Sequence, residues 1–173
     1  MSEHTQERVL QALQSAFQAI VAGESYGGGT YNYTPKHVLR FPALTSECLR
    51  ADADGNVIYV ISPDETQINP STFTDDEAMA AFDISLARRF TPTKGDDPYD
   101  PPTEDRLLIQ NRLLQDAMGC LAAVNEAQTR PFGITVQIHP RFENRKAEDT
   151  YMAGWALAFL RIDVQYDYTR TAP

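Results

Sequence analysis

The chain has 173 residues, a length typical of one domain, and 42% of them are hydrophobic, which excludes a disordered or fibrous protein. Its formal net charge of −9 has the wrong sign for a protein that grips nucleic acid by neutralising phosphates. Acidic side chains keep a surface soluble, and where they line a channel they let a polyanion slide past. We therefore expect residues 1–173 to form a single domain that does not bind nucleic acid specifically.

The cysteine content and the start of the chain indicate a cytosolic folding compartment. Cys48 and Cys120 are the only cysteines, they do not form a CxxC pair, and no basic, apolar signal segment precedes them. No window is long and apolar enough to cross a bilayer, so a soluble protein without membrane contact is expected. Cys120 falls on an apolar helical face, which favours a small buried hydrophobe over a nucleophile.

The first predicted element is an amphipathic helix over Gln6–Val21. Apolar residues recur there at helical spacing, Thr5 is a possible N-cap, and Gly23 is positioned to stop the helix.

A glycine- and tyrosine-rich stretch, Gly23–Pro35, follows the helix. Three successive glycines remove backbone restraint, while Tyr26, Tyr31 and Tyr33 supply large rings, so we expect a mobile loop that leads into a strand. The stretch lacks the Lys-Ser/Thr of a phosphate-binding loop and does not follow a strand, which argues against nucleotide binding.

Two short segments, Val38–Phe41 and Val57–Ser62, are rich in β-branched and aromatic residues and are predicted strands. The connection between them, Thr45–Asn56, is polar and ends in turn residues that include Asp52 and Asp54. A calcium loop is the sharper alternative, but the downstream bidentate Glu is missing.

The next segment, Asp76–Phe90, carries two periodicities. Alternation favours a strand, whereas spacing of three and four residues, with Thr74 and Glu77 as a capping box, favours a helix. We choose a strand over Ala81–Phe90. Four prolines, one glycine and three aspartates then predict a long exposed loop over Thr91–Thr103.

The clearest helix is predicted over Glu104–Ala127, with Thr103 as its N-cap. Strict alternation predicts strands over Ile134–His139 and within Tyr151–Tyr168. The expected fold is α+β: a mixed or antiparallel sheet packed by an N-terminal helix and one long central helix, with a long C-terminal β-hairpin.

The sequence contains no recognisable catalytic, metal or cofactor motif. His4, His37 and His139 have no partner at metal-ligand spacing, and His139 with Glu143 is a weak acid/base pair. Because catalytic residues assemble from distant positions, a ligand-binding or enzymatic domain built from His37, His139 and loop carboxylates stays an alternative. The main expectation is a non-enzymatic protein without cofactors that assembles with other proteins.

The order of these elements resembles the tail terminator (tail completion) proteins of long-tailed bacteriophages. The resemblance is carried by VLQALQSAFQAIVAG at the start, by the Tyr-Asn-Tyr-Thr-Pro-Lys-His-Val stretch, by VIYVISPDE as a central strand followed by an acidic turn, and by WALAFLRIDVQYDYTRTAP as the closing strand. These features span nearly the whole chain, and their specificity lies in their order. A neck or head-closure protein is the nearest alternative.

The resemblance implies a homohexameric ring at the head–tail junction of the virion, assembled in the host cytoplasm. The ring caps the tail tube protein, docks to the head-completion or connector protein, and lets DNA pass through its lumen. Candidate contact residues for neighbouring subunits or partners are Tyr26, Tyr31, Tyr33, Tyr99 and Trp155, with Trp155 alternatively a core anchor. Candidate residues of an acidic lumen or rim are Asp52, Asp54, Asp64, Glu65, Asp96 and Asp97.

Overall fold

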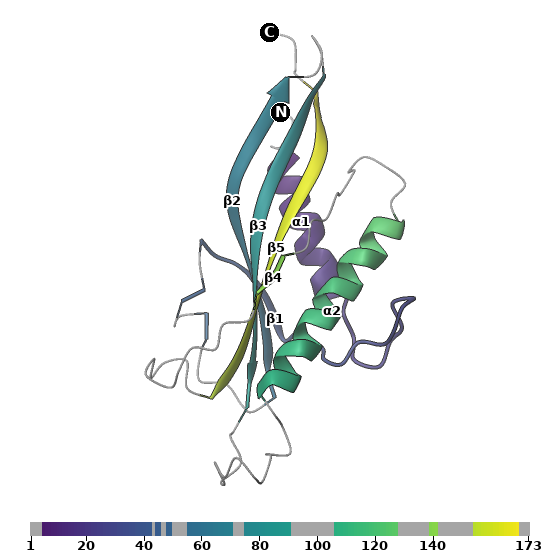
Figure 1. Ribbon diagram of the computed structural model, residues 1–173, viewed down its shortest axis with the longest axis vertical. Coiled ribbons are helices and arrows are strands. Elements are labelled where there is room, and N and C mark those ends of the chain that lie inside the picture. Colours follow the sequence, from purple (N-terminus) through teal and green to yellow (C-terminus); the bar gives the residue numbers. More distant parts are fainter. Residues whose placement is uncertain are drawn as a thin grey trace.

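The computed structural model describes residues 5–42, 44–45, 48–49, 55–70, 75–90, 106–127, 139–141 and 154–169 (Figure 1). The elements in chain order are α1 (Thr5–Gln18), β1 (His37–Arg40), β2 (Val57–Pro70), β3 (Asp75–Arg89), α2 (Arg106–Ala127), β4 (His139–Arg141) and β5 (Trp155–Thr169).

The strands form one sheet in the order β1-β2-β3-β5-β4. β1 runs parallel to β2, and the other neighbours are antiparallel. The predicted α+β class with a mixed sheet is therefore confirmed. β5, from the C-terminal part of the chain, is an interior strand, because it lies between β3 and β4.

Both helices pack on the same face of the sheet and cover the main hydrophobic core (Figure 1). Alternation along the strands directs every second residue into this core, where Tyr59 meets Phe17 of α1 edge to face with ring centroids 5.4 Å apart. The strand residues of this core are Val38, Val57, Tyr59, Ile61, Ala80, Phe82, Ile84, Leu86, Ala156, Ala158, Leu160, Ile162 and Val164.

The opposite face of the sheet carries a second, smaller core. Ile58, Ala87, Trp155 and Leu157 belong to it, and Cys48 and Leu49 pack on them from the segment between β1 and β2. Trp155 is only 3% exposed. Because β3 and β5 have a packed layer on both faces, both sets of alternating residues are apolar along their central parts.

The segment with two periodicities is a strand, so the choice of a strand is confirmed; β3 begins earlier than expected, at Asp75, and ends at Arg89, one residue before Phe90. β3 pairs with β2 on one side and with β5 on the other over nearly all its residues. The helical spacing arises because Phe82, Leu86 and Phe90 share one face of a strand as well as one face of a helix.

β2 does not end at Ser62, and the acidic turn expected after it is wrong. The strand continues to Pro70, and a register shift between Pro63 and Thr66 marks an irregularity in its pairing with β3. Asp64 and Glu65 therefore lie within a strand, at this irregularity.

Proline is tolerated in β2 because of the direction in which its backbone points. The carbonyl oxygens of Val57 and Ile61 accept hydrogen bonds from the N–H groups of Lys36 and Phe41, so these alternate residues of β2 point away from β3. Pro63 continues this alternation. Its missing N–H therefore breaks no hydrogen bond with β3, and the sequence rule that proline ends a strand does not hold here.

The helix ends differ from expectation by a few residues. α1 ends at Gln18 rather than Val21, because the Ile20 N–H donates to the Phe17 carbonyl in a tightened last turn. Val21 lies beyond the helix and is exposed. α2 begins at Arg106, and the expected cap Thr103 and loop Thr91–Thr103 lie outside the described residues.

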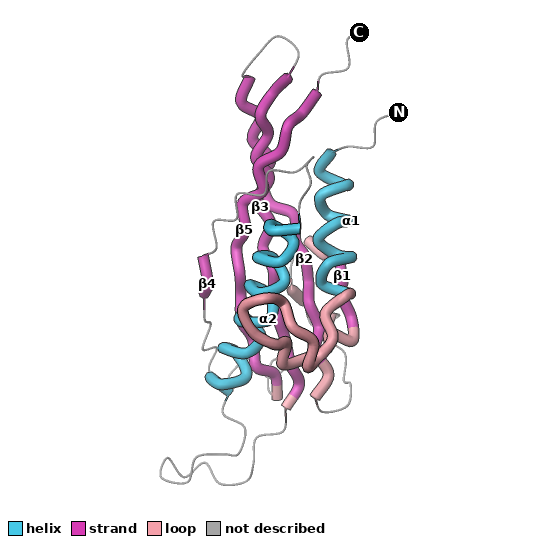
Figure 2. Tube along the Cα trace, turned by 90° about the vertical axis from the view of Figure 1, so that its right-hand side faces the viewer, coloured by secondary structure: helices cyan, strands magenta, loops and turns pink. Residues whose placement is uncertain are grey.

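β2, β3 and β5 continue past the end of α2 (Figures 1 and 2). They have 14, 15 and 15 residues, which at about 3.3 Å per residue gives strands of roughly 50 Å, whereas the 22 residues of α2 span about 33 Å. We call this end of the sheet the distal arm and define it as residues 62–70, 75–83 and 161–169; on its helix-facing side Ala80, Phe82, Ile162 and Val164 still belong to the main core.

Candidate interaction surface on helix α2

Residues 22–34, which we call the tyrosine loop, fold back over the outer side of α2 (Figures 1 and 2). The Gly23 N–H donates to the Tyr31 carbonyl at 2.8 Å, and the Tyr31 N–H donates to the Glu24 carbonyl at 3.0 Å. Gly23 has φ +87°, a value that favours glycine. The loop expected to be mobile is therefore a hydrogen-bonded hairpin seated on a helix.

Asp116 of α2 anchors the C-terminal half of this loop. Its Oδ1 accepts hydrogen bonds at 2.8 Å from both the backbone N–H and the side-chain amide of Asn32, and its Oδ2 accepts the Tyr33 N–H at 2.9 Å. The Asp116 residue is fully buried. Burial raises the pKa of this carboxyl above its ordinary value, while the bonds from Asn32 and Tyr33 act in the opposite direction.

A polar cluster lies beneath the loop, formed by Tyr31, Tyr59, Cys120 and Asp116. Burial raises the pKa of Tyr31 to about 12 and that of Cys120 to about 11, and it also raises the pKa of Tyr59. All three groups are therefore neutral at physiological pH, and Cys120 is buried as the sequence predicted. A neutral, enclosed thiol is a poor nucleophile.

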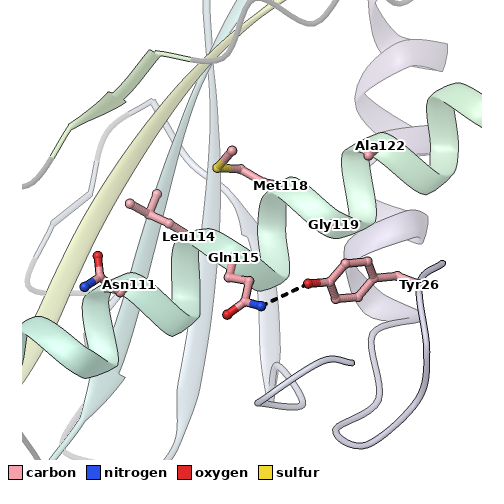
Figure 3. Close-up of a pocket in the computed structure, with 7 residues that line it drawn as sticks. All are labelled: Tyr26, Asn111, Leu114, Gln115, Met118, Gly119 and Ala122. Atoms are coloured by element: carbon pink, nitrogen blue, oxygen red, sulfur yellow. Dashed lines mark hydrogen bonds between the residues drawn. The ribbon is translucent and has the colours of Figure 1, made fainter. Parts of the chain in front are cut away.

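The Tyr26 ring makes the second contact between the tyrosine loop and α2. A Cβ atom at Gly119 would lie 2.6–2.7 Å from three carbon atoms of the Tyr26 ring, so the ring rests on helix backbone that only glycine leaves open. The Gln115 side-chain amide donates to the Tyr26 hydroxyl at 3.2 Å (Figure 3). The Tyr26 and Tyr31 rings are 4.8 Å apart, which ties the tip of the loop to its anchor.

An open hollow of about 500 Å³ lies beside Tyr26 on the outer face of α2 (Figure 3). Its lining is mostly apolar. The lining residues are Tyr26, Asn111, Leu114, Gln115, Met118, Gly119 and Ala122. Toward the start of α2, Leu107 and Leu108 are 50% and 42% exposed. We call the outer side of α2, which carries the lining residues of the hollow together with Leu107 and Leu108, the α2 face.

We expect the contact between Tyr26 and Gly119 to appear as coupling in a double-mutant cycle. Ala in place of Gly inside a helix stabilises by about 1 kcal/mol when nothing is in its way. Gly119→Ala should give this gain in a Tyr26→Ala background, whereas in the wild-type background the displaced ring should cancel it. Urea unfolding followed by circular dichroism measures the four free energies. Equal effects in both backgrounds would mean that the ring does not rest on Gly119 in solution.

The structure separates the residues that the sequence proposed for protein contacts. Tyr26, Tyr31 and Tyr33 lie together in the tyrosine loop, where the Arg88 guanidinium also stacks on the Tyr33 ring at 4.7 Å. Trp155 is buried in the second core, so its alternative reading as a core anchor is confirmed. Tyr99 lies outside the described residues.

The proposed acidic residues do not form one described cluster. Asp64 and Glu65 lie in β2 within the distal arm, while Asp52, Asp54, Asp96 and Asp97 lie outside the described residues.

The histidine site considered from the sequence does not assemble. His37 begins β1 and His139 begins β4, and these strands are the opposite edges of the sheet. Four strand spacings of about 4.8 Å separate them. Within the described residues, no group of three His, Cys, Asp or Glu side chains could hold a metal ion. None of the described helices has the length and apolar character needed to cross a membrane.

Sequence reasoning missed Asp116, Gln115 and Gly119, which position the tyrosine loop. A signal was present, because Asp116 and Gly119 interrupt an otherwise apolar stretch inside a long helix. An acid on the buried side needs a hydrogen-bonding partner, and glycine within a helix indicates close packing.

The chain matches no family model, and no curated protein matches it. What the molecule itself defines is an α+β fold with a mixed sheet, two helices on one face and a loop-capped surface on α2.

Proposed function

We propose that this chain is a structural subunit that assembles into a ring on the end of a bacteriophage tail tube. The ring stops tube polymerisation and presents the surface that docks to the head connector. The observation that carries the proposal is the unpaired outer edge on each side of the sheet. β1 covers only four residues of β2 and β4 only three of β5, so along most of their length the outer edges of these long strands have no strand partner among the described residues. Such edges are templates for pairing with another chain.

The acid surplus supports the same proposal. A net charge of −9 gives a ring of six copies a strongly negative surface, and a negative lumen repels DNA and lets it pass. Asp64 and Glu65 in the distal arm are the described candidates for this lumen or its rim. No cofactor is needed for this role, and the partners are further copies of the chain, the tube protein and the connector protein.

The proposal includes the finer fold that the resemblance implies. The 22 residues of α2 support one long central helix, and the antiparallel pairing of β4 with β5 supports a C-terminal hairpin. The place of the protein would be the head–tail junction of the virion.

The test is assembly on purified tail tubes. Negative-stain images should show ring-shaped density on one end of each tube, with six copies per tube by quantitative labelling, and added protein should stop tube growth. A ring that binds isolated connectors but not tubes would place the protein in the neck instead. A chain that binds neither tubes nor connectors, and stays monomeric at high concentration, would contradict the proposal.

A further inference from the structure

Charge is distributed unevenly along the sheet. The distal arm contains the basic residue Arg161 and is otherwise acidic at its charged positions. These acidic residues are Asp64, Glu65, Asp75, Asp76, Glu77, Asp83, Asp163 and Asp167. The side chains of Arg161 and Asp83 form an ion pair at 3.7 Å, which leaves the rest of the arm with a clear surplus of negative charge.

The strand register makes part of this charge unfavourable in a single chain. Glu77 of β3 is directly opposite Asp167 of β5. Like charges at directly opposed positions of an antiparallel pair destabilise it, and a cation from outside the chain relieves the repulsion. The distal arm is therefore suited to a positively charged partner surface.

The α2 face has the opposite character. Arg112 is exposed there, and Arg106, whose guanidinium lies 5.3 Å from the centroid of the Phe90 ring, begins the helix. The acids of α2 are Asp116, which is buried under the tyrosine loop, and Glu126, near the C-terminal end of the helix. With Leu108 exposed beside Arg112 and the hollow next to Tyr26, the N-terminal half of the face is basic and apolar in a chain of strongly negative net charge.

We propose that the distal arm of one copy docks on the α2 face of the next copy, head to tail. This inference rests on the self-assembly in the proposed function and names its contact surfaces. The two surfaces differ, so the contact is heterologous, and repeating it generates a closed ring or an open filament. Opposite charge selects this arrangement over arm-to-arm or α2-to-α2 contacts, each of which brings like charges together.

The dimensions indicate a weak pairwise contact. Each of the three strands contributes nine residues to the distal arm, so the arm presents a face of roughly 30 by 10 Å, or about 300 Å². This area is well below the roughly 800 Å² per partner of a standard interface. A single pair is therefore expected to dissociate readily, and ring closure supplies the additional stability because it closes two contacts for each copy. Association should thus be steep in protein concentration and weakened by salt.

A charge exchange on the full-length chain tests this arrangement. Arg112→Glu reverses the charge of the α2 face, and Glu77→Lys reverses a charge of the arm while giving Asp167 an attractive partner. Glu77→Lys should therefore leave the monomer as stable as the wild type or slightly more stable. Leu108→Glu is a second variant of the α2 face, in case Arg112→Glu perturbs folding through its proximity to Asp116.

A matched control makes the same change of −2 in net charge at another place on the surface. The double variant Ser15→Glu/Gln18→Glu places them at exposed positions of α1 and changes the net charge as much as Arg112→Glu does. Sedimentation velocity over a concentration series, alone and with tail tubes, measures association. Thermal unfolding checks that each variant is folded.

Arg112→Glu, Leu108→Glu and Glu77→Lys should each weaken association roughly tenfold, while the α1 control stays within about twofold of the wild type. Combining Arg112→Glu with Glu77→Lys, in one chain or by mixing the two variants, should restore it. If the wild type associates and the single variants do so equally well, the docking surfaces are wrong and the ring proposal stands. If only the α2 variants weaken association, the arm is not the occupant of the α2 face. A wild type that associates neither alone nor on tubes overturns the proposed function itself.

Discussion

Asp116→Ala should lower the free energy of unfolding by about 3 kcal/mol. The substitution removes a buried acceptor and leaves the backbone N–H groups of Asn32 and Tyr33 without their partner. Hydrogen bonds to a charged group contribute about 1.5–3 kcal/mol each, and every buried donor left unpaired adds its own desolvation cost. Because the tyrosine loop has its anchor at this carboxylate, much of the loss should appear as local opening of the loop. Urea unfolding measures the total.

Local opening of the tyrosine loop can be measured separately through Cys120, which is buried beneath the loop. In a Cys48→Ala background, labelling of Cys120 by a thiol reagent should be much faster for Asp116→Ala than for the parent. Glu7→Ala is the matched control, because it also removes a carboxylate that accepts hydrogen bonds, from Arg40 and Gln11, but at an exposed site. It should leave labelling of Cys120 unchanged. Unchanged labelling in Asp116→Ala would show that the anchor is not needed.

The pH profile gives an independent check on Asp116. Its pKa is raised in the folded chain above the ordinary value of 3.8. Between pH 3.8 and the pKa of the folded state, the folded chain therefore binds the proton more tightly than the unfolded chain. The contribution of this group to stability is therefore fully present below pH 3.8 and decreases as the pH rises through the folded pKa. Asp116→Asn should remove this decrease, which a comparison of unfolding at several pH values detects.

Trp155→Ala should destabilise the chain by about 4 kcal/mol. The side chain is buried on the face opposite the helices and packs in the second core with Ile58, Ala87 and Leu49, so its removal leaves a large cavity in a layer with few other aromatic residues. The Arg89 guanidinium, 5.8 Å from the ring centroid, also loses its stacking surface. Unfolding in urea followed by circular dichroism measures the change.

Two variants show whether this loss comes from burial. Phe159→Ala alters the same face of the same strand at a half-buried position and should cost clearly less. Trp155→Phe keeps most of the buried volume and should cost less than the alanine variant. If Trp155→Ala kept the stability of the parent while ring assembly was lost, Trp155 would be an interface residue instead of a core anchor.

Local sequence patterns predicted much of this fold. Alternation predicted β3 and β5, composition predicted β1 and the first part of β2, and apolar spacing predicted both helices, because each of these elements buries one face or both against a packed layer. Of the predicted strand Ile134–His139, all but His139 lies outside the described residues. The errors came from tertiary context. The strand was predicted to end before Pro63, yet the backbone of Pro63 points to the outer side of β2, and the helical spacing of 76–90 was overridden by strand partners on both sides. Which strand pairs with which depends on residues distant in sequence, so periodicity could not give the sheet order.

The candidate surface was only half predictable. Tyr26, Tyr31 and Tyr33 stood out as rings in a glycine-rich stretch, but nothing local indicated that they seat on a helix more than 80 residues later in the chain. Asp116 and Gly119 are the other half of that contact. Each is explained only once the loop is present, because the first supplies its acceptor and the second its empty space.

The place of β5 in the sheet has a consequence for how the chain folds. β2 and β3 are neighbours in sequence and can form their hairpin early, but β3 keeps an unpaired edge until β5 arrives, with pairings as distant as Asp75 and Thr169. Closing such long loops before any contact forms makes folding slow. During synthesis the half-built sheet therefore exposes a long apolar strand until the end of β5 has left the ribosome. Removing β5 would delete an interior strand, so we expect C-terminal truncation to cause aggregation rather than a shortened fold.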